Sequence, residues 1–224
     1  MINTLVHPGG SSGRLLHVLL LVATGACYAQ VLGFDFVVYD DVSFVLNNPM
    51  VQQGFTFKSV AWAFGTQSPS GWNPLSWFSH MLDCLLFKDW AGGHHLTSAL
   101  LHMANVSLLF ELLRRMTAST WRSATVAGLF AIHPQNVESV AWIAERRDVL
   151  CMFWMLVTLH FYVSYTRRLT WGGYALTFCA FVLALLAKPM AVTLPCAMVL
   201  LDAWPLGRFK PGDTRALRRC LIEK

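Results

Sequence analysis

The sequence predicts an all-α membrane protein, a polytopic bundle of about six transmembrane helices with a long structured outer loop. Hydrophobic residues make up 55% of the 224 residues and charged residues only 13%, against roughly 25% in a typical soluble domain. Apolar runs of the length of a membrane span recur along the chain. The net charge is +5, but the basic residues flank the apolar runs and do not form one stripe, which argues against nucleic-acid binding.

The apolar runs divide the chain into spans and loops. The predicted order is a cytoplasmic N-terminus (1–13), a first transmembrane helix (14–33), a first extracytoplasmic loop (34–93), transmembrane helices two to six (94–207) and a cytoplasmic tail (208–224). A span needs about 20 mainly apolar residues, and the apolar stretches are 15–33, 95–113, 120–132, 149–165, 171–187 and 190–204. The third is too short to cross unaided. The polar tail has no clear ending, so we expect an N-terminal fragment.

Basic residues are sorted by side of the predicted membrane. With a cytoplasmic N-terminus, most arginines and lysines fall on the cytoplasmic side, as the positive-inside rule requires. The basic residues predicted on the outer side are Lys58, Lys88, Arg146, Arg147 and Lys188. Topology does not account for the last three, so we expect an anionic group at the outer face.

The outer loop contains one clear helical pattern, from Leu75 to Phe87. Its apolar residues recur at helical spacing, and Ser76, Ser79, His80 and Asp83 lie opposite them. Such a helix either lies in the membrane interface or packs against other parts of the protein. The pattern leaves both arrangements open.

Two adjacent carboxylates, Asp40 and Asp41, follow the first span closely. Carboxylates near a membrane surface are costly to desolvate, and an aspartate in that place can act as general base for a hydroxyl group or bind a cation. A solvated loop with a helix cap is the alternative explanation.

The segment His133–Asp148 places five charges between two spans. On one continuous helix Glu138, Trp142 and Glu145 would share a face, with Arg146 beside it. A salt-bridged loop helix explains the same pattern without a ligand.

Arginine is suited to fork around phosphate oxygens. Lys188 lies at the outer tip of a helical hairpin that is otherwise apolar. Together with Arg146 and Arg147 it would complete a cationic pocket, although a lone lysine at a membrane surface is common.

Histidines gather at the start of the second span. His94 and His95 are adjacent, and His102 shares a face with His95. With Asp40 or Asp41 they would offer metal ligands, but hydrogen-bonded polar groups inside a bundle are the favoured interpretation, and a divalent metal is not favoured. The six cysteines lack metal-site spacing and are typical of small buried hydrophobic residues.

These stretches, in this order, resemble the membrane domain of the transmembrane and tetratricopeptide-repeat O-mannosyltransferases, the TMTC proteins, and their bacterial relatives. The matching segments run from about residue 34 to 208: Tyr39–Asp41, Asn48–Pro49, Pro74–Leu75, His94–Leu96, His133–Pro134, Val137–Trp142, Glu145–Leu150, Lys188–Met190 and Trp204–Leu206. Glu138–Trp142 followed by Glu145–Asp148 is the most specific match. The chain departs from the family at Gly71–Leu75, where members commonly have Asn-Trp before the residue that precedes Pro-Leu.

The resemblance implies a GT-C-like fold and a polyprenyl-phosphate-linked sugar as donor. It implies catalytic roles for Asp40 and Asp41, with Asp40 as the base. Donor phosphate would be held by Arg146, Arg147 and Lys188. Residues that would bind the sugar or support the site are His133, Glu138, Glu145, Asp148, His94 and His95.

The expected activity is therefore a membrane glycosyltransferase that moves a sugar, with mannose as the candidate, to a protein serine or threonine hydroxyl. Its partners would be the bilayer, the lipid-linked donor and the protein acceptor. We expect a multi-pass integral protein, in the inner membrane of a bacterium or the endoplasmic reticulum of a eukaryote. The alternatives are a transporter or flippase for an anionic lipid or solute and a noncatalytic membrane module.

Overall fold

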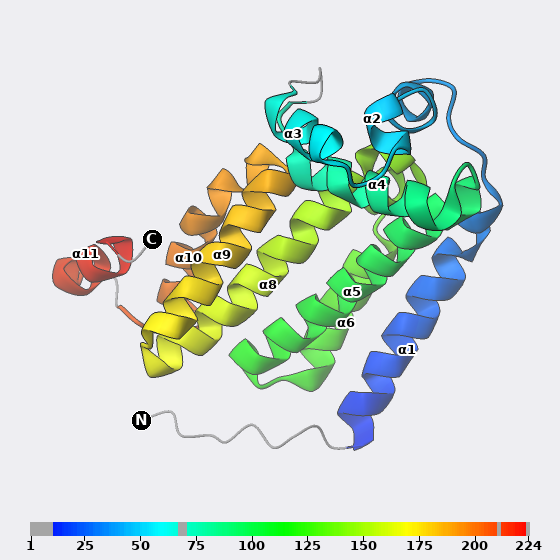
Figure 1. Cartoon of the computed structure of the whole chain (residues 1–224). Coiled ribbons are helices and arrows are strands. Elements are labelled where there is room, and N and C mark those ends of the chain that lie inside the picture. The colour runs from blue at the N-terminus through cyan, green and yellow to red at the C-terminus, as the bar shows by residue number, and fades with distance from the viewer. Residues whose placement is uncertain (1–10, 67–70, 210–211, 223–224) are drawn as a thin grey trace.

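The computed structural model describes residues 11–66, 71–209 and 212–222, and every regular element in these ranges is helical (Figure 1). The predicted all-α class is confirmed. The α-helices are α1 (Ser11–Tyr28), α2 (Pro49–Gln52), α3 (Phe57–Gly65), α4 (Pro74–Phe87), α5 (Ala91–Thr117), α6 (Thr120–Ile132), α7 (Gln135–Ala141), α8 (Arg146–Arg168), α9 (Trp171–Ala187), α10 (Leu194–Ala203) and α11 (Thr214–Ile222). The shorter turns are the 3₁₀ helices η1 (Ala29–Gly33), η3 (Ile143–Glu145) and η4 (Pro189–Thr193) and the π-helix η2 (Val42–Leu46).

The long helices run side by side and form a bundle whose two ends differ (Figure 1). Helices α2, α3, α4 and α7 lie at one end, which we call the loop end. The opposite end, which we call the basic end, carries Arg114, Arg115, Arg167 and Arg168 in the last turns of α5 and α8. There Arg167 Nη2 donates a hydrogen bond to the carbonyl oxygen of Arg115 at 3.1 Å.

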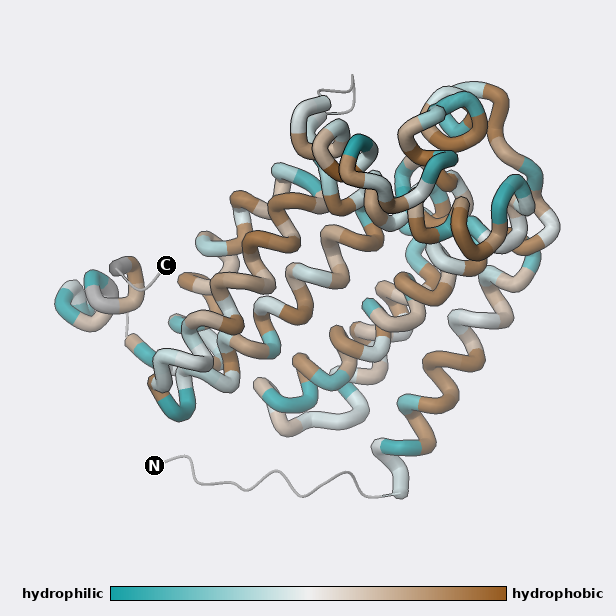
Figure 2. Tube along the Cα trace, in the orientation of Figure 1, coloured by the Kyte–Doolittle hydropathy of each residue, from teal (hydrophilic) through white to brown (hydrophobic). Residues whose placement is uncertain are grey.

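Apolar residues dominate the bundle helices between these two ends (Figure 2). Three stretches are long and apolar enough to cross a membrane, namely Ser11–Gly33, Ala91–Thr117 and Ile143–Arg168. Trp171–Ala187 and Pro189–Ala203 are shorter apolar helices, and α6 has only 13 residues. The membrane class predicted from composition is therefore confirmed, and each of the three long stretches is longer than the apolar run that predicted it.

Small residues bring α8 and α9 close together. Ala184 and Ala187 of α9 are fully buried and form one core cluster with Leu150 and Cys151 of α8 and Ala191 of η4. Small side chains at a helix contact let the two backbones approach, which is how helices associate where lipid removes the hydrophobic driving force. This contact fixes the position of Lys188, which lies between α9 and η4.

Helix α4 lies across the loop end of the bundle (Figure 1). Ser76, His80 and Asp83 are buried, whereas Leu85 and Leu86 are 55% and 63% exposed. The helix therefore packs on protein, one of the two arrangements left open by the sequence, and it also presents leucines outward. An outward apolar face suits the membrane interface.

Candidate active site

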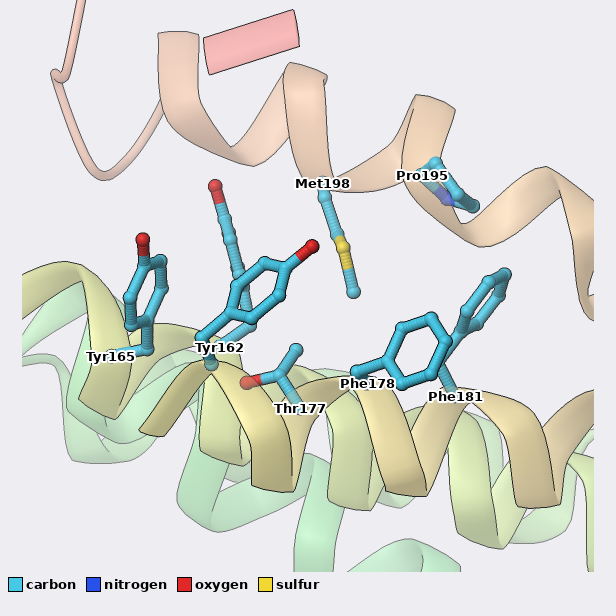
Figure 3. A pocket seen from close by; sticks show the side chains of 8 residues that line it. Tyr162, Tyr165, Thr177, Phe178, Phe181, Pro195 and Met198 are labelled. Atoms are coloured by element: carbon cyan, nitrogen blue, oxygen red, sulfur yellow. The ribbon is translucent and has the colours of Figure 1, made fainter. Parts of the chain in front are cut away.

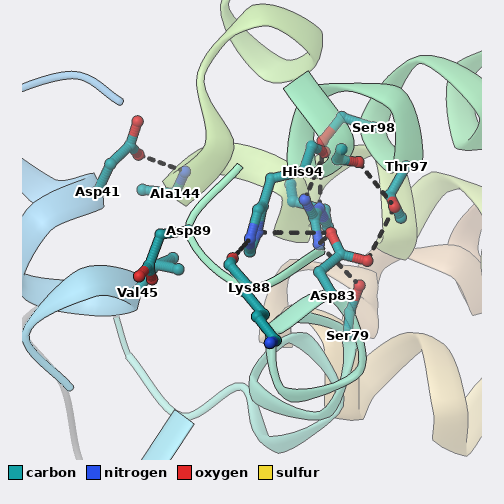
Figure 4. Close-up of polar contacts among 12 residues, drawn as sticks. Asp41, Val45, Ser79, Asp83, Lys88, Asp89, His94, Thr97, Ser98 and Ala144 are labelled. Carbon is teal, nitrogen blue, oxygen red and sulfur yellow. Dashed lines mark hydrogen bonds and ion pairs between the residues drawn. The ribbon is translucent and has the colours of Figure 1, made fainter. Parts of the chain in front are cut away.

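The loop that carries Asp40 and Asp41 is tied to the segment that precedes α8. Asp41 is fully buried. Its Oδ1 accepts a hydrogen bond from the backbone N–H of Ala144 at 2.8 Å (Figure 4), and its Oδ2 accepts one from the N–H of Val37 at 3.0 Å. The first outer loop and the Glu145–Asp148 segment therefore meet at the same end of the bundle.

The environments of the two carboxylates differ. Burial raises the pKa of Asp41, and the N–H groups of Val37 and Ala144 partly oppose that rise. Asp40 is only half-buried. It lies two residues before the π-helix η2, whose N-cap is Asp41; π-helices are rare and occur often at functional sites. Asp41 is thus held by backbone N–H groups inside the protein, whereas Asp40 keeps partial access to solvent.

The predicted continuous helix across residues 133–148 is wrong. Helix α7 ends at Ala141, and Trp142 adopts an extended backbone with φ −104° and ψ 117°. This break turns the N–H of Ala144 toward Asp41 and lets α8 begin at Arg146. Because the helix is interrupted, Glu138 and Glu145 do not share a helical face.

Arg146 points into the bundle and is fully buried. Its Nη1 lies 2.5 Å from Asp83 Oδ2, and its Nη2 donates to the carbonyl oxygen of His94 at 2.6 Å. Figure 4 labels these two partners. Its Nε also donates to Ser98 Oγ at 3.2 Å. A guanidinium enclosed in this way has no open side for a phosphate, so the geometry contradicts the predicted contact between Arg146 and the donor phosphate. The reason is that α8 begins at this residue and directs it toward α4 and α5.

Asp83 is the ion-pair partner of Arg146 that the sequence did not single out. It pairs with Arg146, and its Oδ1 accepts a hydrogen bond from the Thr97 hydroxyl at 2.8 Å. The sequence contained a signal, since an aspartate amid the serines and histidine of one helix face needs a partner when that face is buried.

His94 and His95 are buried beside this ion pair and are not surface ligands. His94 donates from Nε2 to the carbonyl oxygen of Lys88 at 2.8 Å, and its Nδ1 lies 3.6 Å from Asp83. His95 makes an edge-to-face contact with Phe34, with ring centroids 6.1 Å apart. Their burial leaves neither ring on the surface to contact a sugar.

Arg147 and Lys188 lie at the loop end and are each paired with a carboxylate. Arg147 contacts Glu145, and Lys188 contacts Asp148. The relative side-chain exposure is 14% for Arg147 and 24% for Lys188. Both side chains are therefore partly accessible to solvent, and each charge is balanced by a neighbouring carboxylate.

His133 and Glu138 lie on the outside of the same end. Both are exposed, and His133 Nδ1 accepts a hydrogen bond from the N–H of Gln135 at 3.3 Å, in the first turn of α7. This contact supports the start of the helix.

Metal ligation has no support in the part of the chain that the structure describes. Within it, no three His, Cys, Asp or Glu side chains are grouped to hold a metal ion. His102 instead uses its Nε2 to contact the carbonyl oxygen of Ala131 at 3.0 Å.

An aromatic cavity lies far from these residues along the bundle, between α8, α9 and α10 (Figure 3). Its volume is about 40 Å³, and Tyr162, Phe178, Phe181 and Met198 line it. Small-molecule sites usually measure about 300–1,000 Å³. This cavity is therefore too small for a sugar.

Comparison with characterised proteins relates the chain to one group. It is 32% identical over 193 residues to protein O-mannosyl-transferase Tmtc1 of Drosophila melanogaster, covering 81% of this chain and 22% of that protein. Mouse protein O-mannosyl-transferase TMTC1 is 30% identical over 164 residues, 69% of this chain and 17% of that protein. Human protein O-mannosyl-transferase TMTC4 is 26% identical over 211 residues, 82% of this chain and 28% of that protein.

The chain thus spans between a sixth and a third of the length of these curated relatives. No family model matches it, and no solved structure does.

Proposed function

Because the chain belongs to the family of the TMTC-type protein O-mannosyl-transferases, we propose that it takes part in transferring a sugar to a hydroxyl group of protein. The donor we propose is a hexose carried on a polyprenyl phosphate, with mannose as the candidate sugar. The observation that carries the proposal is the hydrogen bond from Ala144 to Asp41. It joins the loop that holds the candidate base to the segment that holds the candidate cations.

Asp40 is the proposed general base. It is half-buried and follows the first long apolar stretch closely, so it would lie where a lipid-linked head group meets water. Its carboxylate takes the proton of the acceptor hydroxyl as the hydroxyl oxygen attacks carbon 1 of the sugar. The bond between carbon 1 and the phosphate oxygen breaks, and the polyprenyl phosphate leaves with one additional negative charge.

Arg147 and Lys188 are the proposed partners of that leaving phosphate. Both keep partial exposure, and both already lie beside a carboxylate. Positively charged donors aimed at a developing negative charge stabilise a transition state. Glu145 and Asp148 hold the two cations in place before the donor binds.

Arg146 and Asp41 are proposed as positioning residues. Arg146 links α8 to α4 and α5, and Asp41 links the loop of Asp40 to the start of the same helix. The buried carboxylate of Asp41 is occupied by two backbone N–H groups, which supports a structural task over cation binding.

A transfer assay tests the proposal. The purified chain in detergent is incubated with radiolabelled polyprenyl-phosphate mannose and a serine- and threonine-containing peptide, and label on the peptide is counted. Loss of a general base typically costs about 10²–10⁴-fold, so Asp40→Asn should lower kcat by this factor and leave donor KM nearly unchanged. Asp213→Asn, at an exposed aspartate outside the loop end, is the matched control.

The other outcomes separate the alternatives. In proteoliposomes, movement of the labelled lipid across the bilayer without label on peptide would indicate a transporter. Neither transfer nor movement by the wild-type chain would indicate a noncatalytic module. Equal kcat of Asp40→Asn and wild type would remove the base assignment.

A further inference from the structure

A second cavity lies at the loop end, beside the segment of Asp40. Its volume is about 450 Å³, within the range of roughly 300–1,000 Å³ typical of small-molecule sites. Residues Leu32–Phe36 form one wall and Asp89–Gly92 form the other. Val38 and Val42, which flank Asp40 and Asp41 in sequence, complete the lining with Leu46.

The cavity lies where two membrane-length helices reach the same end of the bundle. The stretch Ser11–Gly33 ends in one wall, and Ala91–Thr117 begins in the other. Ends of membrane-length apolar helices lie at the level of lipid head groups. A ligand in this cavity would therefore sit at the depth where a lipid-linked head group is presented.

The lining combines aromatic rings with carboxylates. Phe34, Phe36 and Trp90 supply the rings, and Asp35 and Asp89 supply the carboxylates. The described lining contains no arginine or lysine, so the local charge disfavours a phosphate. Carboxylates accept hydrogen bonds from hydroxyl groups, and exposed aromatic rings offer flat apolar faces. A neutral ring that carries several hydroxyl groups matches both features.

Close backbone approach builds the wall that contains Trp90. A Cβ on Gly92 would lie 2.6 Å from the carbonyl oxygen of Leu32 and 2.8 Å from Trp90 Nε1. Trp90 is 60% exposed, so its ring is available beside the opening. Gln52 Nε2 donates to Asp89 Oδ1 at 3.4 Å, which orients that carboxylate.

We propose that this cavity binds the neutral sugar ring of the donor, with Asp35 and Asp89 accepting hydrogen bonds from its hydroxyl groups and Trp90 covering one face. The inference rests on the proposed function, since the sugar must lie near Asp40 for transfer. The acidic lining directs the donor phosphate away from this cavity, toward Arg147 and Lys188.

The test measures sugar binding without transfer. The full chain is purified in a detergent that lacks a sugar head group, because a glycoside detergent would compete, and methyl α-mannopyranoside and methyl α-glucopyranoside are examined by saturation-transfer NMR. We expect saturation transfer from the wild-type chain to at least one glycoside. Asp35→Asn, Asp89→Asn and Trp90→Ala should each reduce the signal several-fold, and Trp90→Phe should retain part of it.

Two substitutions outside the cavity serve as controls. Trp121→Ala removes an exposed tryptophan from α6, and Asp213→Asn neutralises a distant exposed carboxylate. Both should bind the glycosides as the wild type does. Melting curves of all variants separate a lost contact from a lost fold. Should Trp90→Ala not fold, the near-isosteric Asp35→Asn and Asp89→Asn variants still test the proposal.

Transfer kinetics separate this inference from the proposed function. The cavity variants should raise donor KM about tenfold, the factor for roughly 1.4 kcal/mol of binding, with a smaller change in kcat. A wild-type chain that transfers sugar, with glycoside binding and donor KM unchanged in the variants, would overturn the sugar site alone. Glycoside binding that is lost in the variants, with no transfer by any chain, would uphold the site and overturn the proposed function. Binding of an arginine- and lysine-containing peptide in place of the glycosides would overturn the sugar assignment.

Discussion

At the scale of single residues, the buried pair of Arg146 and Asp83 organises the loop end. It joins the first residue of α8 to the C-terminal half of α4, and His94 and Ser98 of α5 complete its surroundings. The sequence marked Arg146 as exceptional because it falls on the predicted outer side of the membrane. It did not identify the anion that explains the exception, because the pairing joins residues 63 positions apart, and no local pattern records such a contact.

Breaking this pair should destabilise the protein. Arg146→Met leaves Asp83 buried without its counter-ion, and removal of one partner of a buried pair costs about 3–5 kcal/mol. Arg146→Met combined with Asp83→Leu should recover part of that loss. The measurement is the free energy of unfolding in detergent.

A surface pair provides the comparison. Arg115→Met removes a partly exposed partner of Glu111 and should cost only about 0–1 kcal/mol. Similar losses for Arg146→Met and Arg115→Met would contradict a structural role for the buried pair.

His80 should make the stability of the protein sensitive to acid. Burial lowers the pKa of His80 well below its usual value, and Arg146 and His94 add to the effect. The unfolded chain therefore binds a proton below about pH 6.5 that the native state does not bind, and stability falls as the pH drops below that value. His80→Gln should reduce the pH dependence of the free energy of unfolding in this range by up to about 1.4 kcal/mol per pH unit. Unfolding at pH 7.5, 6.5 and 5.5 measures this, and equal slopes for both proteins would refute it.

At the scale of elements, the sequence located the spans better than the breaks between them. Apolar runs identify buried or lipid-facing helices directly, so α5, α8 and α9 were predicted within a few residues. The break at Trp142 was missed because helical spacing continues across it. Only the tertiary bond between Ala144 and Asp41 shows why the backbone must extend there.

Helix starts offer a matched test of close packing. Gly92 and Gly172 are both the second residue of their helices, α5 and α9. A Cβ on Gly92 would lie 2.6 Å from a backbone oxygen, whereas a Cβ on Gly172 would meet nothing within 4 Å. Gly92→Ala should therefore destabilise the protein by about 1–3 kcal/mol. Gly172→Ala should be neutral or stabilise it by up to about 1 kcal/mol. Thermal unfolding compares them, and equal effects would show that the contact at Gly92 relaxes freely.

At the scale of the whole molecule, charge sorting along the sequence corresponds to the two ends of the bundle. A Cβ placed on Gly13 would lie 3.7 Å from Arg114 Nη1. The start of α1 therefore lies at the basic end. The loop that carries Asp40 and Asp41 meets the segment before α8 at the loop end. This large-scale separation was predictable because lipid and membrane potential act on whole segments. The placement of each side chain within the loop end was not, since it depends on packing among α2, α4, α5 and α7.

The two ends should lie on opposite sides of the membrane. Lys58 of α3 and Arg168 of α8 are both exposed, one at each end, and the positive-inside rule places the basic end in the cytoplasm. In sealed right-side-out vesicles, the extracytoplasmic face of the membrane is the outer surface. A membrane-impermeant maleimide should then label Lys58→Cys at once and Arg168→Cys only after permeabilisation. Inverted vesicles should reverse the order, and the parent chain corrects for its own cysteines. Labelling of both variants from the same side would place base, cations and basic end in one compartment, and it would remove the reason to expect a lipid-linked donor at the loop end.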